Sequence, residues 1–195
     1  LMNWLMINVE FVRGLVGLVM LVGRARLGGL VRRDGLAKRV LVSVAFGCDG
    51  PAGATLGRRQ LTLIGIRLLE WLVGVETTDG HLSFTPNVGW RPGEPRPGFD
   101  QQPIEAWAMA DASHRAWSVT GDGIWRLRAR RASRWLVGQN DTGVVLYDAA
   151  TGGTRDGLME HSANENRGAE STLAGIGTLQ VAGWHAENDD GLLVR

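Results

Sequence analysis

The tetrapeptide WLVG occurs twice in this chain, at residues 71–74 and again at residues 135–138. A run with the apolar spacing of a helix leads into each copy. Residues 78–84 (TDGHLSF) and 141–147 (DTGVVLY) then match in a second respect, because each has a turn glycine followed four residues later by an aromatic. This order predicts a helix and then a short hairpin, twice over.

A glutamate early in the following predicted helix completes each copy, Glu105 in the first and Glu170 in the second. For each of the three kinds of match, the corresponding residues of the two copies are 63 to 65 positions apart. Features that recur in the same order at nearly one offset indicate a structural repeat. We therefore expect a tandem helical hairpin with long loops.

Hydrophobic spacing predicts four helices, over residues 60–76, 102–119, 124–137 and 168–182. The apolar stripe expected for the first consists of Leu61, Ile64, Leu68, Trp71, Leu72 and Val75. The second tolerates a proline in its first turn, and it carries a stripe that would let another helix approach closely, formed by Ala106, Ala110, Ser113 and Trp117.

Asp-Gly dipeptides punctuate the predicted helices at residues 79–80, 122–123 and 156–157. Such pairs favour tight turns with positive backbone angles. The segment 120–123 (TGDG) should therefore break the chain between two helices. We expect helices joined by structured loops.

Composition fits one globular domain: 195 residues, of which 44% are hydrophobic and 21% charged. A net charge of +1 gives no global reason to expect a nucleic-acid partner. The single cysteine, Cys48, excludes an internal disulfide framework and is compatible with a reducing compartment. We expect a cytoplasmic protein, with a peripheral membrane location as the variant discussed next.

Charge is concentrated at the start of the chain, where residues 1–40 contain seven basic and two acidic residues. Residues 1–23 are apolar, but Glu10 and Arg13 near the middle argue against a membrane span. This segment is either buried or irregular, or it is an interfacial helix whose basic continuation binds a membrane surface. We divide the chain into a basic, apolar segment (1–54), a helical-hairpin domain (55–184) and an acidic tail (185–195).

An α/α toroid accommodates hairpin repeats of this kind, with alternate helices lining the inside of a ring. Equivalent helices one repeat apart are then neighbours, so Glu105 and Glu170 could bring two carboxyl groups to the separation of about 5 to 9.5 Å used in glycoside hydrolysis. One would donate a proton while the other stays ionised. The alternative is a structural role for each glutamate, because a negative charge in the first turn of a helix interacts favourably with the helix dipole.

Further polar and aromatic residues of the loops are candidates for binding sugar hydroxyls and rings: Trp90, Asp100, Gln101, Gln102, Tyr147, Asp156, Asn164, Glu165 and Asn166. Each has a structural alternative. Asp100 could cap the second helix, Asp156 could serve only a turn, and Trp90 could be packed into a proline-rich loop.

The helix over residues 124–137 carries a basic face made of Arg126, Arg128, Arg130, Arg131 and Arg134. We interpret this face as solvated surface, with binding of an anion or nucleic acid as the alternative.

Several chemistries have no motif here. The four histidines stand far apart, and the chain has no HExxH, GxSxG or Walker sequence and no complete dinucleotide fingerprint. We expect neither a metal nor a cofactor.

Three ordered motifs resemble a known family: residues 99–106 (FDQQPIEA), residues 135–158 with WLVGQND, LYD and GGTRDGL, and residues 164–174 (NENRGAESTLA). Together they resemble the helical region appended to many bacterial glycosyltransferases, which is similar to six-hairpin glycosidase-type α/α toroids. The resemblance covers residues 60–182. It implies an all-α fold, a partial α/α toroid of helical hairpins with short β-hairpin or loop insertions.

The resemblance also implies a carbohydrate-active domain that binds a glycan or processes it as a glycosidase does. The alternative is a non-catalytic scaffold that docks a glycosyltransferase partner. No Glu-x7-Glu pair occurs, so we do not expect sugar transfer from a nucleotide donor. Because two to three hairpins of a six-hairpin ring are recognisable, we expect an incomplete ring, as in a fragment.

Overall fold

Four helices and one short hairpin form the part of the chain that the computed structural model describes, residues 58–86, 90 and 93–183. The helices are α4 (Arg58–Val75), α5 (Pro103–Thr120), α6 (Ile124–Leu136) and α7 (Ala169–Val181). Two-residue strands β1 (Thr77–Thr78) and β2 (His81–Leu82) pair antiparallel. The mostly helical class is confirmed, and each predicted helix is present within two residues of its expected ends.

The predicted segments 1–54 and 185–195 lie outside the described residues, as does the membrane-binding role expected for residues 1–40. No helix within the described ranges is long and apolar enough to cross a bilayer.

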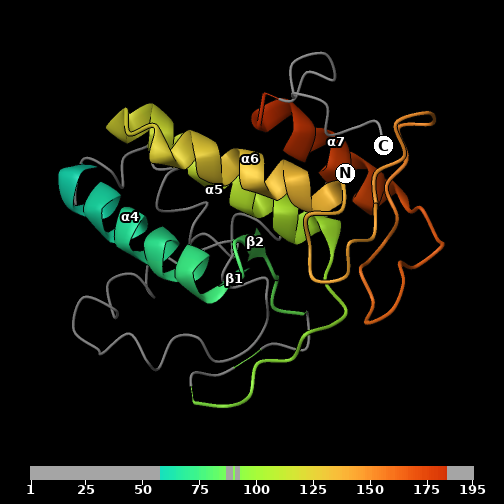
Figure 1. Cartoon of the computed structure of the whole chain (residues 1–195). Coiled ribbons are helices and arrows are strands. Elements are labelled where there is room, and N and C mark those ends of the chain that lie inside the picture. Colours follow the sequence, from blue (N-terminus) through green and yellow to red (C-terminus); the bar gives the residue numbers. More distant parts are fainter. Residues whose placement is uncertain (1–57, 87–89, 91–92, 184–195) are drawn as a thin grey trace, which may run out of the picture.

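Helix α5 is central, because it packs against α4, α6 and α7 (Figure 1). Its predicted small-residue stripe is buried, with Ala106, Ala110 and Ser113 at 0% exposure. It ends where expected, since Gly121 has a φ of 71° and donates its N–H to the Trp117 carbonyl at 2.7 Å. The glycine thereby turns the chain back so that α6 can pack on α5.

The stripe predicted for α4 is wrong in part. Leu72 is buried, but Trp71 is 40% exposed, and the other buried side chains of this helix include Leu69 and Val73. The buried face is therefore rotated from the expected one. Spacing alone predicted an apolar stripe without showing which part of it faces the neighbouring α5, and α5 is the helix that α4 packs against.

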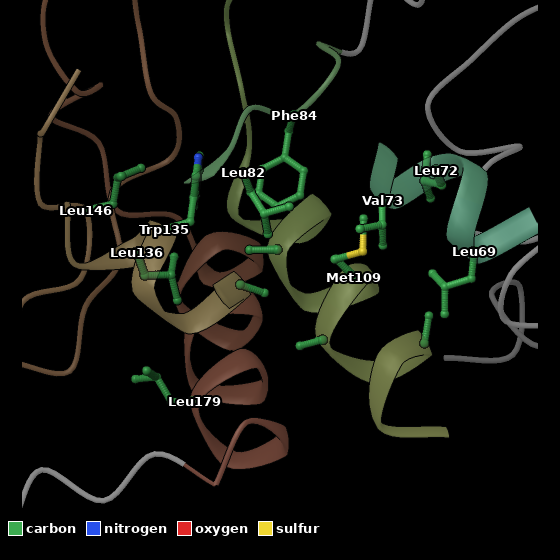
Figure 2. Packing of buried hydrophobic residues seen from close by; sticks show 14 of the residues in the cluster. Leu69, Leu72, Val73, Leu82, Phe84, Met109, Trp135, Leu136, Leu146 and Leu179 are labelled. Carbon is green, nitrogen blue, oxygen red and sulfur yellow. The ribbon is translucent and has the colours of Figure 1, made fainter. Parts of the chain in front are cut away.

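The two WLVG copies occupy different surroundings. Trp135 in α6 is 0% exposed, in contrast to Trp71 in α4. Phe84, which follows β2, packs edge-on against Trp135 with ring centroids 5.1 Å apart. Figure 2 shows Leu82 and Phe84 lying between Trp135 on one side and Val73 of α4 on the other. The hairpin segment thus fills the core between α4 and α6.

The predicted turns are confirmed only at the first Asp-Gly pair. Asp79 and Gly80 have φ angles of 48° and 86° and connect β1 to β2. In the TGDG segment, Gly121 has the positive angle, so the assignment to Gly123 is wrong. Gly157 does not have a positive φ angle. A glycine is favoured there by close packing, because a Cβ would lie 3.2 Å from the Gln101 carbonyl oxygen.

The second hairpin differs from its expected form. Val137 pairs with Val145 in an isolated bridge, and Tyr147 pairs with Thr154, so residues 141–147 are not a two-stranded hairpin by themselves. The amides of Leu146 and Tyr147 both donate to the Leu136 carbonyl at the end of α6. The helix end, and not a local turn, therefore organises this loop.

Helix α7 approaches its neighbours through glycine. A Cβ on Gly175 would lie 2.1 Å from Thr154 Oγ1, and a Cβ on Gly177 would lie 2.7 Å from the Trp107 ring. We predict that Gly175→Ala lowers the free energy of unfolding by about 1–3 kcal/mol, because a methyl group does not fit this contact.

Gly74→Ala in α4 is the matched control for urea unfolding. No atom lies within 4 Å of its added Cβ, so alanine should raise helix stability by about 0.5–1 kcal/mol. Equal effects of the two substitutions would show that the α7 contact is not close-packed.

Candidate functional site

A cleft of about 300 Å³ lies where the first turns of α5 and α7 meet a loop. It is lined by Gln102, Pro103 and Ile104 at the start of α5, by Asp156 of the loop, and by residues 168–171 at the start of α7. Three sequence-predicted site residues, Gln102, Asp156 and Glu170, are therefore brought together from segments far apart in the chain. The volume is at the small end of the range for small-molecule sites.

Asp156 fixes the start of α7. Its Oδ1 accepts the Gly168 N–H at 2.6 Å, and its Oδ2 accepts a hydrogen bond from the side chain of Asn166. The Gly168 amide lowers the pKa of Asp156 most, and the Ser171 and Asn166 side chains lower it further against the opposing effect of burial. An ionised carboxylate at a helix N-terminus satisfies free amides and is favoured by the helix dipole.

The loop on this side of the cleft is cross-linked by polar side chains. Asp148 accepts hydrogen bonds from Thr151 Oγ1 at 2.9 Å and from Arg167 Nη1 at 2.7 Å. Thr151, Arg167 and the Ala150 amide lower the pKa of Asp148 to about 2. Arg155 forms an ion pair with Glu165. These polar contacts help to hold the loop that carries Asp156, in addition to its buried Leu146 and Leu158.

The two glutamates predicted as a catalytic pair are placed differently. Helices α5 and α7 pack against each other, as the repeat predicted. Glu170 is exposed and lines the cleft, whereas Glu105 is 7% exposed and is not among the residues that line it. The cleft therefore contains Glu170 together with Asp156.

Gln101 is buried inside the protein at 0% exposure. Its Oε1 accepts the Phe84 N–H at 2.9 Å and the Trp135 Nε1–H at 3.2 Å. Its Nε2 donates to the Gly98 carbonyl at 2.8 Å and to the Asp141 carboxylate. All four bonds that the amide can form are used, so we assign Gln101 a structural role.

The other predicted binding residues are not among those that line the cleft. Asp100 is exposed, and its Cβ approaches Gly157. The alternative that Asp100 caps α5 is wrong, because the helix begins at Pro103 and Gln102 is the cap residue. Trp90 donates its Nε1–H to the Glu94 carbonyl at 2.7 Å, and Tyr147 packs partly buried against the core. Asn164 Oδ1 accepts the Asn166 amide at 3.0 Å.

A polar cluster that sequence reasoning missed joins the two hairpin segments. His81 Nε2 and Asp141 Oδ1 are 2.7 Å apart, and Asp141 is also bonded to Gln101. Burial raises the pKa of Asp141, but hydrogen bonds from Ser83, His81 and Gln101 outweigh it and lower the pKa below its usual value. The repeat offered a signal, because His81 and Asp141 lie in the two matching segments. Among the described residues, no group of three or more His, Cys, Asp or Glu side chains could hold a metal ion.

Neither a protein-family model nor a curated protein matches this chain. The candidate site is therefore argued from its geometry.

Replacing Gln101 with alanine should lower the free energy of unfolding by about 3 kcal/mol. The substitution leaves two buried donors, Phe84 N–H and Trp135 Nε1–H, without their acceptor, and each such loss costs about 1–3 kcal/mol. Gln102→Ala is the control from the adjacent residue, which is only partly buried, and it should change stability by less than about 1 kcal/mol. Urea unfolding measures both, and equal losses would refute the structural assignment of Gln101.

Replacing Asp156 with asparagine should lower stability at pH 7 by about 1 kcal/mol, because α7 loses an anionic cap. The folded-state pKa of Asp156 is below the ordinary aspartate value of 3.8, so this contribution is present above pH 3.8 and is lost as pH falls through the folded pKa. The gap between wild type and variant should therefore close under acid, as measured by urea unfolding from pH 7 to pH 2. Asp79→Asn at the exposed turn should change stability at pH 7 by less than about 0.5 kcal/mol.

Proposed function

We propose that this chain is a carbohydrate-active helical domain of the α/α-toroid type, associated with glycosyltransferases, and that its cleft between α5 and α7 binds a glycan. The observation that carries the proposal is the convergence of Gln102, Asp156 and Glu170 on one cleft. These residues belong to the three motifs that resemble the glycosyltransferase-appended region. The association with a transferase rests on that resemblance alone. The proposed cytoplasmic location rests on the single cysteine, which is compatible with a reducing compartment.

The chemistry of the cleft suits sugar hydroxyls. A carboxylate accepts hydrogen bonds at about four lone-pair positions, and a glutamine side chain both donates and accepts. Asp156 is held ionised by its low pKa, so it can only accept. Pro103 and Ile104 add apolar surface at the same place. A mixture of acceptors, one amide and a small apolar area fits a hydroxyl-rich ring better than a purely ionic or apolar ligand.

Binding is favoured over hydrolysis by the same geometry. Hydrolysis of a glycosidic bond needs one carboxyl group that donates a proton and a second that stays ionised. The lowered pKa of Asp156 makes it a poor proton donor near neutral pH. Glu105, the predicted partner of Glu170, does not line the cleft. A non-catalytic site is therefore the form of the proposal that the residues support best.

Glycan binding can be tested by titrating the full chain with neutral oligosaccharides of glucose, galactose, mannose and N-acetylglucosamine. We predict that Gln102→Ala and Glu170→Gln each weaken the binding of the best ligand about tenfold, which corresponds to the loss of about one hydrogen bond. Glu160→Gln is the matched control, because Glu160 is an exposed glutamate outside the cleft. Equal affinity in wild type and Glu170→Gln would refute the proposed cleft.

The same ligands should be recovered intact after long incubation. Product release that disappears in both Glu105→Gln and Glu170→Gln, with the circular dichroism of the helices unchanged, would instead support the two-glutamate hydrolase. Glu160→Gln again serves as the control for a general effect of charge.

A further inference from the structure

Helix α6 concentrates positive charge on a nearly neutral protein. Its sequence IWRLRARRASRWL contains five arginines and no acidic residue, while the whole chain has a net charge of +1. We define the arginine face as the side of this helix formed by Ile124, Arg126, Leu127, Arg130 and Arg131.

The arginine face points away from the core. The opposite side of α6 is buried through Trp125, Ala129, Ala132, Ser133, Trp135 and Leu136. Arg126 and Arg130 are four residues apart, as are Leu127 and Arg131, which places these four side chains along one side of the helix. Arg126 and Arg130 are exposed. Helix α6 packs on α5 by one side (Figure 1). Its other side carries the exposed arginines.

The exposed arginines of this face are not used in the ion pairs that hold the loops and helices together. Such pairs join His81 to Asp141, Arg115 to Asp111, Arg155 to Glu165 and Arg167 to Asp148. Within this part of the chain, Arg126, Arg130 and Arg131 have no carboxylate partner. Arg126 instead lies over the Trp117 ring, 5.0 Å from its centroid.

The arrangement of charge is unfavourable for the helix itself. Arg126 lies in the first turn, which has no acidic residue, and a cation there opposes the helix dipole. Arg126 and Arg130 are like charges one turn apart, which destabilises a helix. Arginines that lower the stability of their own helix, and have no carboxylate partner among the described residues, are suited to an external anion.

We propose that the arginine face binds the surface of an anionic lipid membrane. Two exposed apolar side chains lie among the arginines, Ile124 at 43% and Leu127 at 59% exposure. An interfacial helix uses such residues to enter the boundary between headgroups and acyl chains while its cations contact lipid phosphates. Nucleic acid fits less well, because both tryptophans of α6, Trp125 and Trp135, are buried and cannot stack on bases.

The test uses the full chain and flotation with vesicles of phosphatidylcholine, with and without phosphatidylglycerol. Binding should require phosphatidylglycerol and weaken at high salt, because surface attraction between charges is screened. The variant R130Q/R131Q should bind these vesicles about 25-fold more weakly than wild type, since each arginine near an anionic surface adds about fivefold to affinity. Unchanged binding by this variant would overturn the proposal.

The matched control removes the same charge elsewhere. R67Q/R115Q replaces one exposed arginine in α4 and one in α5, and it should retain most of the binding. If both double variants lose binding equally, net charge alone is responsible and the arginine face has no special role. This comparison also separates α6 from the basic residues of segment 1–40, which are present in every variant.

A third variant distinguishes lipid from nucleic acid. Leu127→Ser removes an exposed apolar side chain, so it should weaken binding to the vesicles. Because it leaves the charge unchanged, it should not affect any binding to double-stranded DNA. The wild type could instead bind DNA and not anionic vesicles, and lose the DNA binding in R130Q/R131Q. That result would overturn the membrane proposal and identify nucleic acid as the partner of the arginine face. Circular dichroism of each variant verifies that the helices are retained.

Discussion

The buried amide of Gln101 is the interaction on which the described fold depends. It bonds the hairpin segment through Phe84, helix α6 through Trp135 and the following loop through Asp141. Its backbone pairs in both directions with Leu158, at 3.0 and 2.8 Å. Segments that are distant in the chain thus meet at one side chain two residues before α5 begins. Because a buried amide is stable only when its bonds are made, this residue fixes how the loops lie over the helices.

The cleft follows from that arrangement. Pairing of residue 101 with Leu158 brings the loop that carries Asp156 beside the start of α5, and Asp156 in turn holds the start of α7. Two helix N-termini and one ionised carboxylate therefore meet at the same place. The close contact of Gly175 with Thr154 keeps α7 near the loop. The structural and proposed binding roles of Asp156 are compatible, since this residue holds the start of α7 and also lines the cleft.

The sequence predicted correctly those features that depend on interactions between residues close together in the chain. Apolar spacing and the TGDG segment predicted all four helices and the break between α5 and α6, because helix formation depends on neighbours three and four residues away. It failed at the exposed Trp71, since the face of α4 that is buried depends on where α5 lies. It also failed to separate Gln101, which is fully buried, from Gln102, which lines the cleft.

The sequence by itself determined the helices, the Asp79-Gly80 turn and a candidate set of polar residues, all of which depend on short-range patterns. Only the tertiary structure decided which of these residues share a site. It placed Glu170 at the cleft and Glu105 in the interior, although both occupy matching positions in the repeat. The physical reason is that burial and pKa are set by side chains distant in the chain, as the contacts of Asp156 with Asn166 and Gly168 illustrate.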